Sequence, residues 1–213
     1  MSFSAVVRRL LISCPGDVPD KDLSIVRQAI NHWNGVYGEN FGSVVLPISW
    51  SEHAAAEFGQ PPQAILNNQI VDNADGCIAI FANRLGTPTA TAESGTAEEI
   101  QRLAQSGKYV AVLRCMRDVD PRRMDLGQAV RLEEYMNSVR EQALVLSYSS
   151  DVELTQHLSN IHIQAVSRDQ ARAELQRADE PLSATRNAEV WPRVDSSERV
   201  SSDARGGVRT TRD

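Results

Sequence analysis

The segment Gly76–Phe81 constrains the fold more than any other part of this 213-residue chain. It reads Gly-Cys-Ile-Ala-Ile-Phe, a short and continuously apolar run. Such a run is typical of a central parallel strand, because helices cover both faces of a parallel sheet and leave its strands no exposed side. We therefore expect an α/β domain built around this strand.

Strand-like and helix-like segments alternate on both sides of this run. Strands are expected over residues 5–13, 43–50, 107–113 and 143–147. Apolar residues at helical spacing mark residues 18–37, 61–71, 97–105 and 126–139. Gly35 and Gly38 are expected to end the first of these helices.

The order of the strands follows from these connections. Five βα repeats with short loops imply right-handed crossovers and an all-parallel sheet. Proline in a strand favours an edge position, so Pro47 places the second strand outermost. The predicted fold is a doubly wound, five-stranded parallel sheet of flavodoxin-like order 2-1-3-4-5.

The character of the chain changes after the fifth strand. Residues 1–150 are expected to form the α/β domain, and residues 178–213, rich in Ser, Arg, Asp and Ala, a disordered tail. Residues 151–177 are expected to form a helical extension of one or two helices. Its packing stripe would consist of Leu154, Leu158, Ile161 and Val166.

Composition limits the classes of partner and the compartment that the protein is expected to have. The net charge of −6 argues against a nucleic-acid partner or an anionic membrane. No apolar run has the length of a membrane span, and the N-terminus lacks the order of a signal peptide. The three cysteines, an odd number in apolar strand-like runs, suit a reducing compartment. A cytoplasmic protein is expected.

Two loops stand out at the edge where a doubly wound sheet binds ligands, outside the carboxyl ends of its strands. Residues 13–17, Ser-Cys-Pro-Gly-Asp, form either a plain turn in which Asp17 caps the next helix or the wall of a nucleotide pocket. Residues 83–95 form a long loop of small and polar residues, which usually binds something.

The long loop runs into Thr96-Ala-Glu-Glu99, which has the spacing of a capping box between Thr96 and Glu99. The helix dipole would stabilise an ionised Glu98 or Glu99 here. An ionised carboxylate at a pocket can bond a sugar or stabilise an oxocarbenium ion during glycosidic cleavage. Adjacent helical residues point about 100° apart, so only one of the two glutamates can face the sugar.

Several other residues have two interpretations each. Arg84 follows the third strand and could bind phosphate or form a salt bridge that anchors the loop. Trp50 ends the second strand and could stack on a base or pack in the core. His157 and His162 are five residues apart with no cysteine or carboxylate cluster, so no metal site is predicted.

The stretch that ends the long loop and opens the next helix resembles known enzymes. Residues 93–110, Glu-Ser-Gly-Thr-Ala-Glu-Glu-Ile-Gln-Arg-Leu-Ala-Gln-Ser-Gly-Lys-Tyr-Val, resemble the Asp-Ser-Gly-Thr-x-x-Glu-(Ile/Leu)-Gly-x-Ala…Gly-Lys-x-Val segment of nucleoside 2-deoxyribosyltransferases. The chain departs from it at Glu93, where the transferases carry aspartate, and at residues 101–104. Their nucleophile is the glutamate three residues after the threonine, which corresponds to Glu99.

A wider set of segments is similar to TIR-like proteins of bacterial defence systems. The similarity covers most of residues 8–115 and is carried by residues 12–18, Trp50, and residues 69–75, 84–89 and 94–99. TIR enzymes hydrolyse the nicotinamide–ribose bond of NAD⁺ with a glutamate on a helix. The resemblance therefore implies an NAD⁺ glycohydrolase in defence or signalling.

The resemblance and the loop positions together define the candidate site. Glu99, ahead of Glu98, is the candidate catalytic residue. The candidate substrate-binding residues are Ser13, Pro15, Gly16, Asp17, Trp50, Arg84, Thr87, Ser94, Gly95 and Thr96. No glycine-rich phosphate loop is present, so NAD⁺ is expected as a substrate and no cofactor is expected.

Two alternatives remain open at this point. The same glutamate would serve a nucleoside or nucleotide N-glycosidase or a 2-deoxyribosyltransferase. Some TIR domains are scaffolds, so a non-catalytic module that binds a nucleotide or another TIR surface also fits. An active NADase would harm its cell, which implies control by self-association of the domain or by an activating partner.

Overall fold

The computed structural model describes residues 2–179 and confirms the predicted fold class. Five parallel strands are arranged in the order β2-β1-β3-β4-β5. The strands are β1 (Val6–Ser13), β2 (Ser43–Ile48), β3 (Gly76–Phe81), β4 (Tyr109–Cys115) and β5 (Val145–Tyr148). The edge position of β2, predicted from Pro47, is confirmed.

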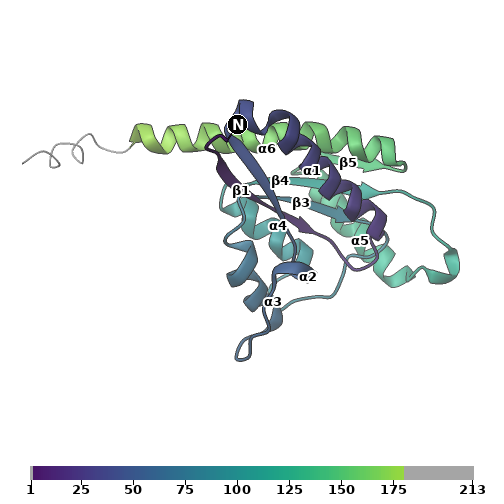
Figure 1. The fold of residues 1–213 in the computed structure, drawn as a ribbon. Coiled ribbons are helices and arrows are strands. Elements are labelled where there is room, and N and C mark those ends of the chain that lie inside the picture. Colours follow the sequence, from purple (N-terminus) through teal and green to yellow (C-terminus); the bar gives the residue numbers. More distant parts are fainter. Residues whose placement is uncertain (1, 180–213) are drawn as a thin grey trace, which may run out of the picture. The chain divides into compact units, whose positions relative to one another are not determined.

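Helices cover both faces of the sheet (Figure 1). The long helices are α1 (Asp20–Phe41), α4 (Gly95–Gln105), α5 (Leu126–Arg140) and α6 (Asp151–Asp179). Short helical segments are α2 (Trp50–His53), α3 (Pro62–Leu66), the π-helical turn η1 (Asn67–Val71) and the 3₁₀ turn η2 (Pro121–Arg123). In one core cluster α1 and α6 pack on the sheet, and in the other η1, α4 and α5 pack on the opposite face.

Helix α1 extends beyond both glycines that were expected to end it. Gly38 is buried within the helix, and a Cβ there would lie 3.1 Å from the carbonyl oxygen of Ser43. The helix instead ends at Gly42, which adopts a left-handed conformation (φ 55°) and donates its N–H to the carbonyl of Glu39 at 3.1 Å. The prediction failed because a glycine inside a helix also serves close packing.

The five-stranded sheet belongs to one compact unit, Met1–Arg177. Residues 151–177 belong to a single helix, α6, and its predicted stripe is buried in the core. The predicted disordered tail lies outside the described residues from residue 180 onward. Within the described part of the chain, no helix is long and apolar enough to cross a membrane.

Truncating Leu158 should test how much of the domain's stability comes from α6. This side chain is completely buried between α6 and the sheet. We expect Leu158→Ala to lower the free energy of unfolding by about 2–5 kcal/mol, through lost burial and the cavity that remains. Val152→Ala, at a 65% exposed position of the same helix, should change it by less than about 0.5 kcal/mol. Urea unfolding would measure both, and equal effects would contradict the packing of α6.

Candidate active site

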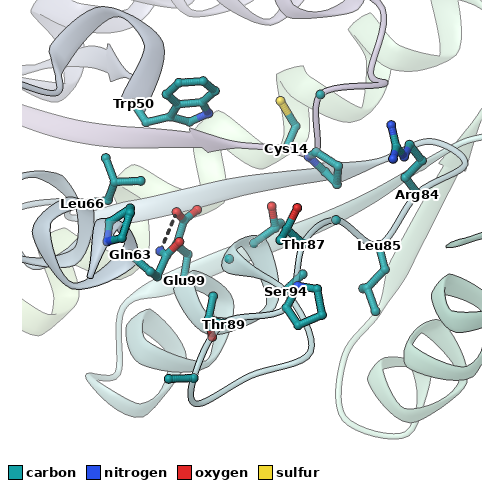
Figure 2. Close-up of a pocket in the computed structure, with 18 of the residues that line it drawn as sticks. Cys14, Trp50, Gln63, Leu66, Arg84, Leu85, Thr87, Thr89, Ser94 and Glu99 are labelled. Carbon is teal, nitrogen blue, oxygen red and sulfur yellow. Dashed lines mark hydrogen bonds between the residues drawn. The ribbon is translucent and has the colours of Figure 1, made fainter. Parts of the chain in front are cut away.

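A cavity of about 640 Å³ opens at the carboxyl ends of β1 and β3, where the strand order reverses (Figure 2). Its walls come from four places in the chain: residues 14–16 after β1, residues 50–66 after β2, residues 84–90 after β3, and the start of α4. This volume lies within the usual range of ligand-binding pockets. The site thus forms at the edge where doubly wound proteins bind ligands.

Glu99 lies on the wall of this cavity with only 8% of its surface exposed. It comes from the second turn of α4. One carboxylate oxygen, Oε2, accepts a hydrogen bond from the Ser13 hydroxyl, and Oε1 accepts one from the Gln63 amide at 3.3 Å. Burial raises the pKa of Glu99 above its ordinary value, while these two hydrogen bonds act in the opposite direction. The cavity therefore contains a carboxylate that is partly desolvated but held in place.

Glu98 has a different environment, although it is the adjacent residue. Its side chain is not on the cavity wall. Its carboxylate accepts hydrogen bonds from Asn67 at 2.7 Å and from Thr89 at 2.5 Å. Burial acts to raise the pKa of Glu98, but the hydrogen bonds outweigh it and hold the pKa below the ordinary value. Glu99 alone of the two glutamates faces the cavity.

The expected capping box between Thr96 and Glu99 is wrong. The N-cap of α4 is Ser94, whose backbone is extended and whose hydroxyl accepts a hydrogen bond from the Ala97 N–H at 3.1 Å. Thr96 is already inside the helix, because the chain enters it two residues earlier than the pattern suggested. Glu99 therefore has no part in capping.

Asp17 does not cap the following helix either. Helix α1 begins at Asp20 after Pro19, with no side-chain cap. The Asp17 carboxylate instead accepts a hydrogen bond from the backbone N–H of Asn83 at 2.7 Å. It links the loop after β1 to the loop after β3. Asp17 thus shapes the site from behind, without being part of the wall.

Most of the predicted substrate-binding residues do meet around the cavity. Those on its wall are Pro15, Gly16, Trp50, Arg84, Thr87, Ser94, Gly95 and Thr96. Ser13 lies behind the wall, 1% exposed at the end of β1, and reaches the cavity through its hydrogen bond to Glu99.

Trp50 and Arg84 both have groups free for a ligand. Trp50 is the first residue of α2 and is 55% exposed, so it is not a core residue. Figure 2 shows it on the opposite side of the pocket from Ser94. Arg84 is exposed, and its guanidinium has no ion pair among the described residues. The loop-anchoring salt bridge considered for Arg84 is therefore absent from the part of the chain that the structure describes.

The sequence reasoning missed the contribution of the segment after α2. Pro61, Pro62, Gln63 and Leu66 line the cavity, and Gln63 contacts Glu99 directly. The only sequence signal was the Pro-Pro pair that starts a helix at the same sheet edge. Cys14 is also on the wall; it belongs to the loop 13–17 expected to form a turn or a pocket wall, but it is not among the predicted binding residues. Burial and the nearby Glu99 raise the pKa of its thiol to about 11, so it is neutral at physiological pH.

The described residues offer no cluster of three or more His, Cys, Asp or Glu side chains that could hold a metal ion. The side chains of the wall that can form hydrogen bonds carry hydroxyls, one amide, one indole, one thiol, the Glu99 carboxylate and the Arg84 guanidinium. These groups suit an organic ligand with hydroxyl or phosphate groups.

The fold and site define a doubly wound α/β protein with a buried carboxylate at its switch point. Residues 19–162 match a family model described as a domain of unknown function, DUF4062, and this match spans more than half of the chain. The chain therefore belongs to the DUF4062 family. Among curated proteins no match is found.

Three solved structures are similar to the chain at low sequence identity. The rubredoxin oxygen:oxidoreductase of Desulfovibrio gigas is 8% identical (TM-score 0.40), with 80% of this chain but only 38% of that protein covered. Oxidised flavodoxin 1 from Bacillus cereus is 12% identical (TM-score 0.36; 78% and 98% covered). RosB with a bound riboflavin-phosphate intermediate is 10% identical (TM-score 0.31; 92% and 100% covered).

Replacing Glu99 by Gln should stabilise the protein at neutral pH. Folding raises the pKa of Glu99, so this group contributes stability that is complete below its unfolded pKa and is lost as pH rises through the folded value. Glutamine resembles the protonated form. We expect Glu99→Gln to increase the free energy of unfolding by about 0.5–2 kcal/mol near neutral pH, with the gain vanishing in acid.

Glu98→Gln is the matched control and should act with the opposite sign. The lowered pKa of Glu98 contributes stability that is present above its unfolded pKa and is lost as pH falls through the folded value. Its amide variant should therefore be less stable than the parent at neutral pH. Chemical unfolding between acid and neutral pH would measure the free energy of unfolding of both variants. Shifts of the same sign would contradict the two environments assigned to these glutamates.

Proposed function

We propose that this protein is a TIR-like NAD⁺ glycohydrolase that cleaves the nicotinamide–ribose bond with Glu99. The single observation that supports it most is the buried Glu99 carboxylate on the wall of a cavity of about 640 Å³, held by Ser13 and Gln63. Glu99 is also the residue that the resemblance to TIR enzymes and deoxyribosyltransferases marks. Because Glu99 does not cap α4, a structural role at the helix start no longer accounts for it.

The titratable groups of the wall favour NAD⁺ over a neutral nucleoside. They are Cys14, Arg84 and Glu99. A neutral purine or pyrimidine leaves more readily when a general acid protonates it. Nicotinamide in NAD⁺ is a pyridinium and leaves as a neutral molecule without protonation. Glu99 must be ionised to act on the sugar and the Cys14 thiol is a weak acid, so the described wall has no general acid for a neutral base.

The proposed reaction balances without a co-reactant other than water. The bond between C1′ and the pyridinium nitrogen breaks, and its electron pair neutralises the ring. An oxygen of Glu99 stabilises the resulting oxocarbenium ion or bonds to C1′. Water then adds to C1′ and releases a proton, which gives ADP-ribose. Attack by a group of the substrate itself would give a cyclised product.

The remaining walls suit the rest of such a substrate. The exposed Trp50 ring offers a stacking surface for the nicotinamide or adenine base. Arg84 offers a guanidinium without an ion pair among the described residues, which matches a pyrophosphate. Figure 2 shows Arg84 toward one end of the pocket and Gln63, with Glu99 beside it, toward the other. A pyrophosphate at Arg84 would leave the Glu99 end for the ribose that carries nicotinamide.

The proposal predicts that the purified protein releases nicotinamide from NAD⁺. Chromatography would follow nicotinamide and ADP-ribose, at protein concentrations high enough for self-association. Glu99→Gln should lower the rate by at least about 100-fold, because an amide neither attacks C1′ nor carries the negative charge that stabilises the oxocarbenium ion. Glu98→Gln should lower the rate much less, since Glu98 does not face the cavity and a glutamine oxygen can still accept the hydrogen bond from Asn67.

The alternatives give other outcomes in the same assay. Base exchange or hydrolysis with a panel of deoxynucleosides, lost in Glu99→Gln, would favour a deoxyribosyltransferase or nucleoside N-glycosidase. No turnover of either substrate would contradict the enzymatic proposal and favour a nucleotide-binding or interaction module.

Replacing Trp50 by alanine should weaken substrate binding more than chemistry. Stacking of a base on an aromatic ring contributes about 1–3 kcal/mol. We therefore expect the KM for NAD⁺ to rise by about 5- to 150-fold, with a much smaller change in kcat. Steady-state kinetics would measure this. An unchanged KM would show that neither base stacks on this ring.

A further inference from the structure

We infer that Gln63 is a positioning residue for the Glu99 carboxylate, and that Glu98 acts on Glu99 through Asn67 and Gln63. The inference rests on the proposed function for its catalytic meaning. Its structural content depends only on a chain of hydrogen bonds among four side chains. These hydrogen bonds give Glu98 a role although its side chain does not face the cavity.

The spacing of Gln63 and Asn67 makes the chain of bonds available. Gln63 lies in α3, and Asn67 is the first residue of the π-helical turn η1 that continues it. Residues four apart lie on the same side of a helix. The Gln63 amide nitrogen accordingly donates to the Asn67 side-chain oxygen at 3.2 Å. Short π-helical turns inside helices often occur at functional sites.

Each bond in the chain fixes the direction of the next. The ionised Glu98 accepts only, so Asn67 turns its amide nitrogen toward it, at 2.7 Å. The Asn67 oxygen then faces Gln63 and selects its amide nitrogen. That nitrogen also donates to Glu99 Oε1 at 3.3 Å. A flipped Gln63 amide would place its oxygen against the Glu99 carboxylate. The hydrogen bond to the Asn67 oxygen prevents this flip.

Gly95 leaves the space that this arrangement needs. A Cβ at Gly95 would lie 2.6 Å from the side-chain oxygen of Gln63. Any side chain at this first residue of α4 would push the Gln63 amide away. The glycine therefore allows Gln63 to reach Glu99 from the segment after β2.

The loop after β3, which lines the cavity with residues 84–90, is attached to the same series of hydrogen bonds. Thr89 donates to the second oxygen of Glu98 at 2.5 Å, and Thr89 itself lines the cavity. A ligand that moves this loop would change the hold on Glu98 and, through two amides, on Glu99. The two adjacent glutamates thus have separate tasks: Glu99 faces the substrate, and Glu98 orients the groups that hold Glu99.

The test follows the titration of Glu99 directly, whether or not the protein is an enzyme. Carbon-13 NMR of protein labelled at the glutamate carboxyls would report it, with the Glu99 resonance assigned by its loss in Glu99→Gln. Gln63→Leu removes a donor that lowers the pKa of Glu99, so the titration should move to higher pH. Asn67→Leu should move it in the same direction by less.

Two further variants separate positioning from general damage. Asn68→Leu alters the exposed neighbour of Asn67 and should leave the Glu99 titration unchanged. Gly95→Ala keeps Gln63 but displaces it, and should resemble Gln63→Leu without removing any polar group. With NAD⁺, Gln63→Leu should lower kcat by about tenfold or more with little change in KM, because a misplaced catalytic group slows the chemical step.

The outcomes keep the two proposals apart. A Glu99 titration that is the same in the parent, Gln63→Leu and Gly95→Ala would overturn the positioning role, even if nicotinamide is released. A shifted titration in a protein that never releases nicotinamide would keep the positioning role and reject the NAD⁺ glycohydrolase. An equal shift in Asn68→Leu and Asn67→Leu would overturn the role assigned to Glu98.

Discussion

The complete burial of β3 is the constraint on which the rest of the structure depends. Residues 77–81 have no exposed surface, because β1 and β4 pair with both edges of the strand and helices cover both of its faces. The carboxyl ends of β3 and β1 lie side by side, so the loops after both strands meet at the same edge of the sheet. Ser13 and Glu99, 86 residues apart, meet there. The pocket is therefore a consequence of how the core is built.

The two glutamates at this edge show how local environment divides similar groups. Glu99 is buried and accepts two side-chain hydrogen bonds, and its burial raises its pKa. Glu98 accepts side-chain hydrogen bonds that outweigh its burial and lower its pKa. Adjacent titratable groups whose pKa values are pushed in opposite directions are common at active sites. An energetically costly buried carboxylate in a cavity is also what a trade-off between stability and function produces.

Local patterns in the sequence were reliable where one physical effect dominated. Apolar runs located all five strands, and Pro47 identified the edge strand, since a proline cannot donate a ladder hydrogen bond. The patterns failed where several residues could serve equally. Ser94 and Thr96 are both good N-caps, and the extended backbone at Ser94 decided between them. Asp17 could cap a helix, but a loop 66 residues away supplied its partner.

The sequence by itself determined the parallel sheet and its order and made Glu99 the candidate catalytic residue, because hydrophobic periodicity and a compact motif are local properties of the chain. Only the tertiary structure decided which glutamate faces the cavity and what holds it. Gln63 carries no signal in the sequence, since its role depends on a helix phase, the missing side chain of Gly95 and the orientation of Asn67. Those contacts exist only once the segments after β2 and β3 are brought to the same edge of the sheet.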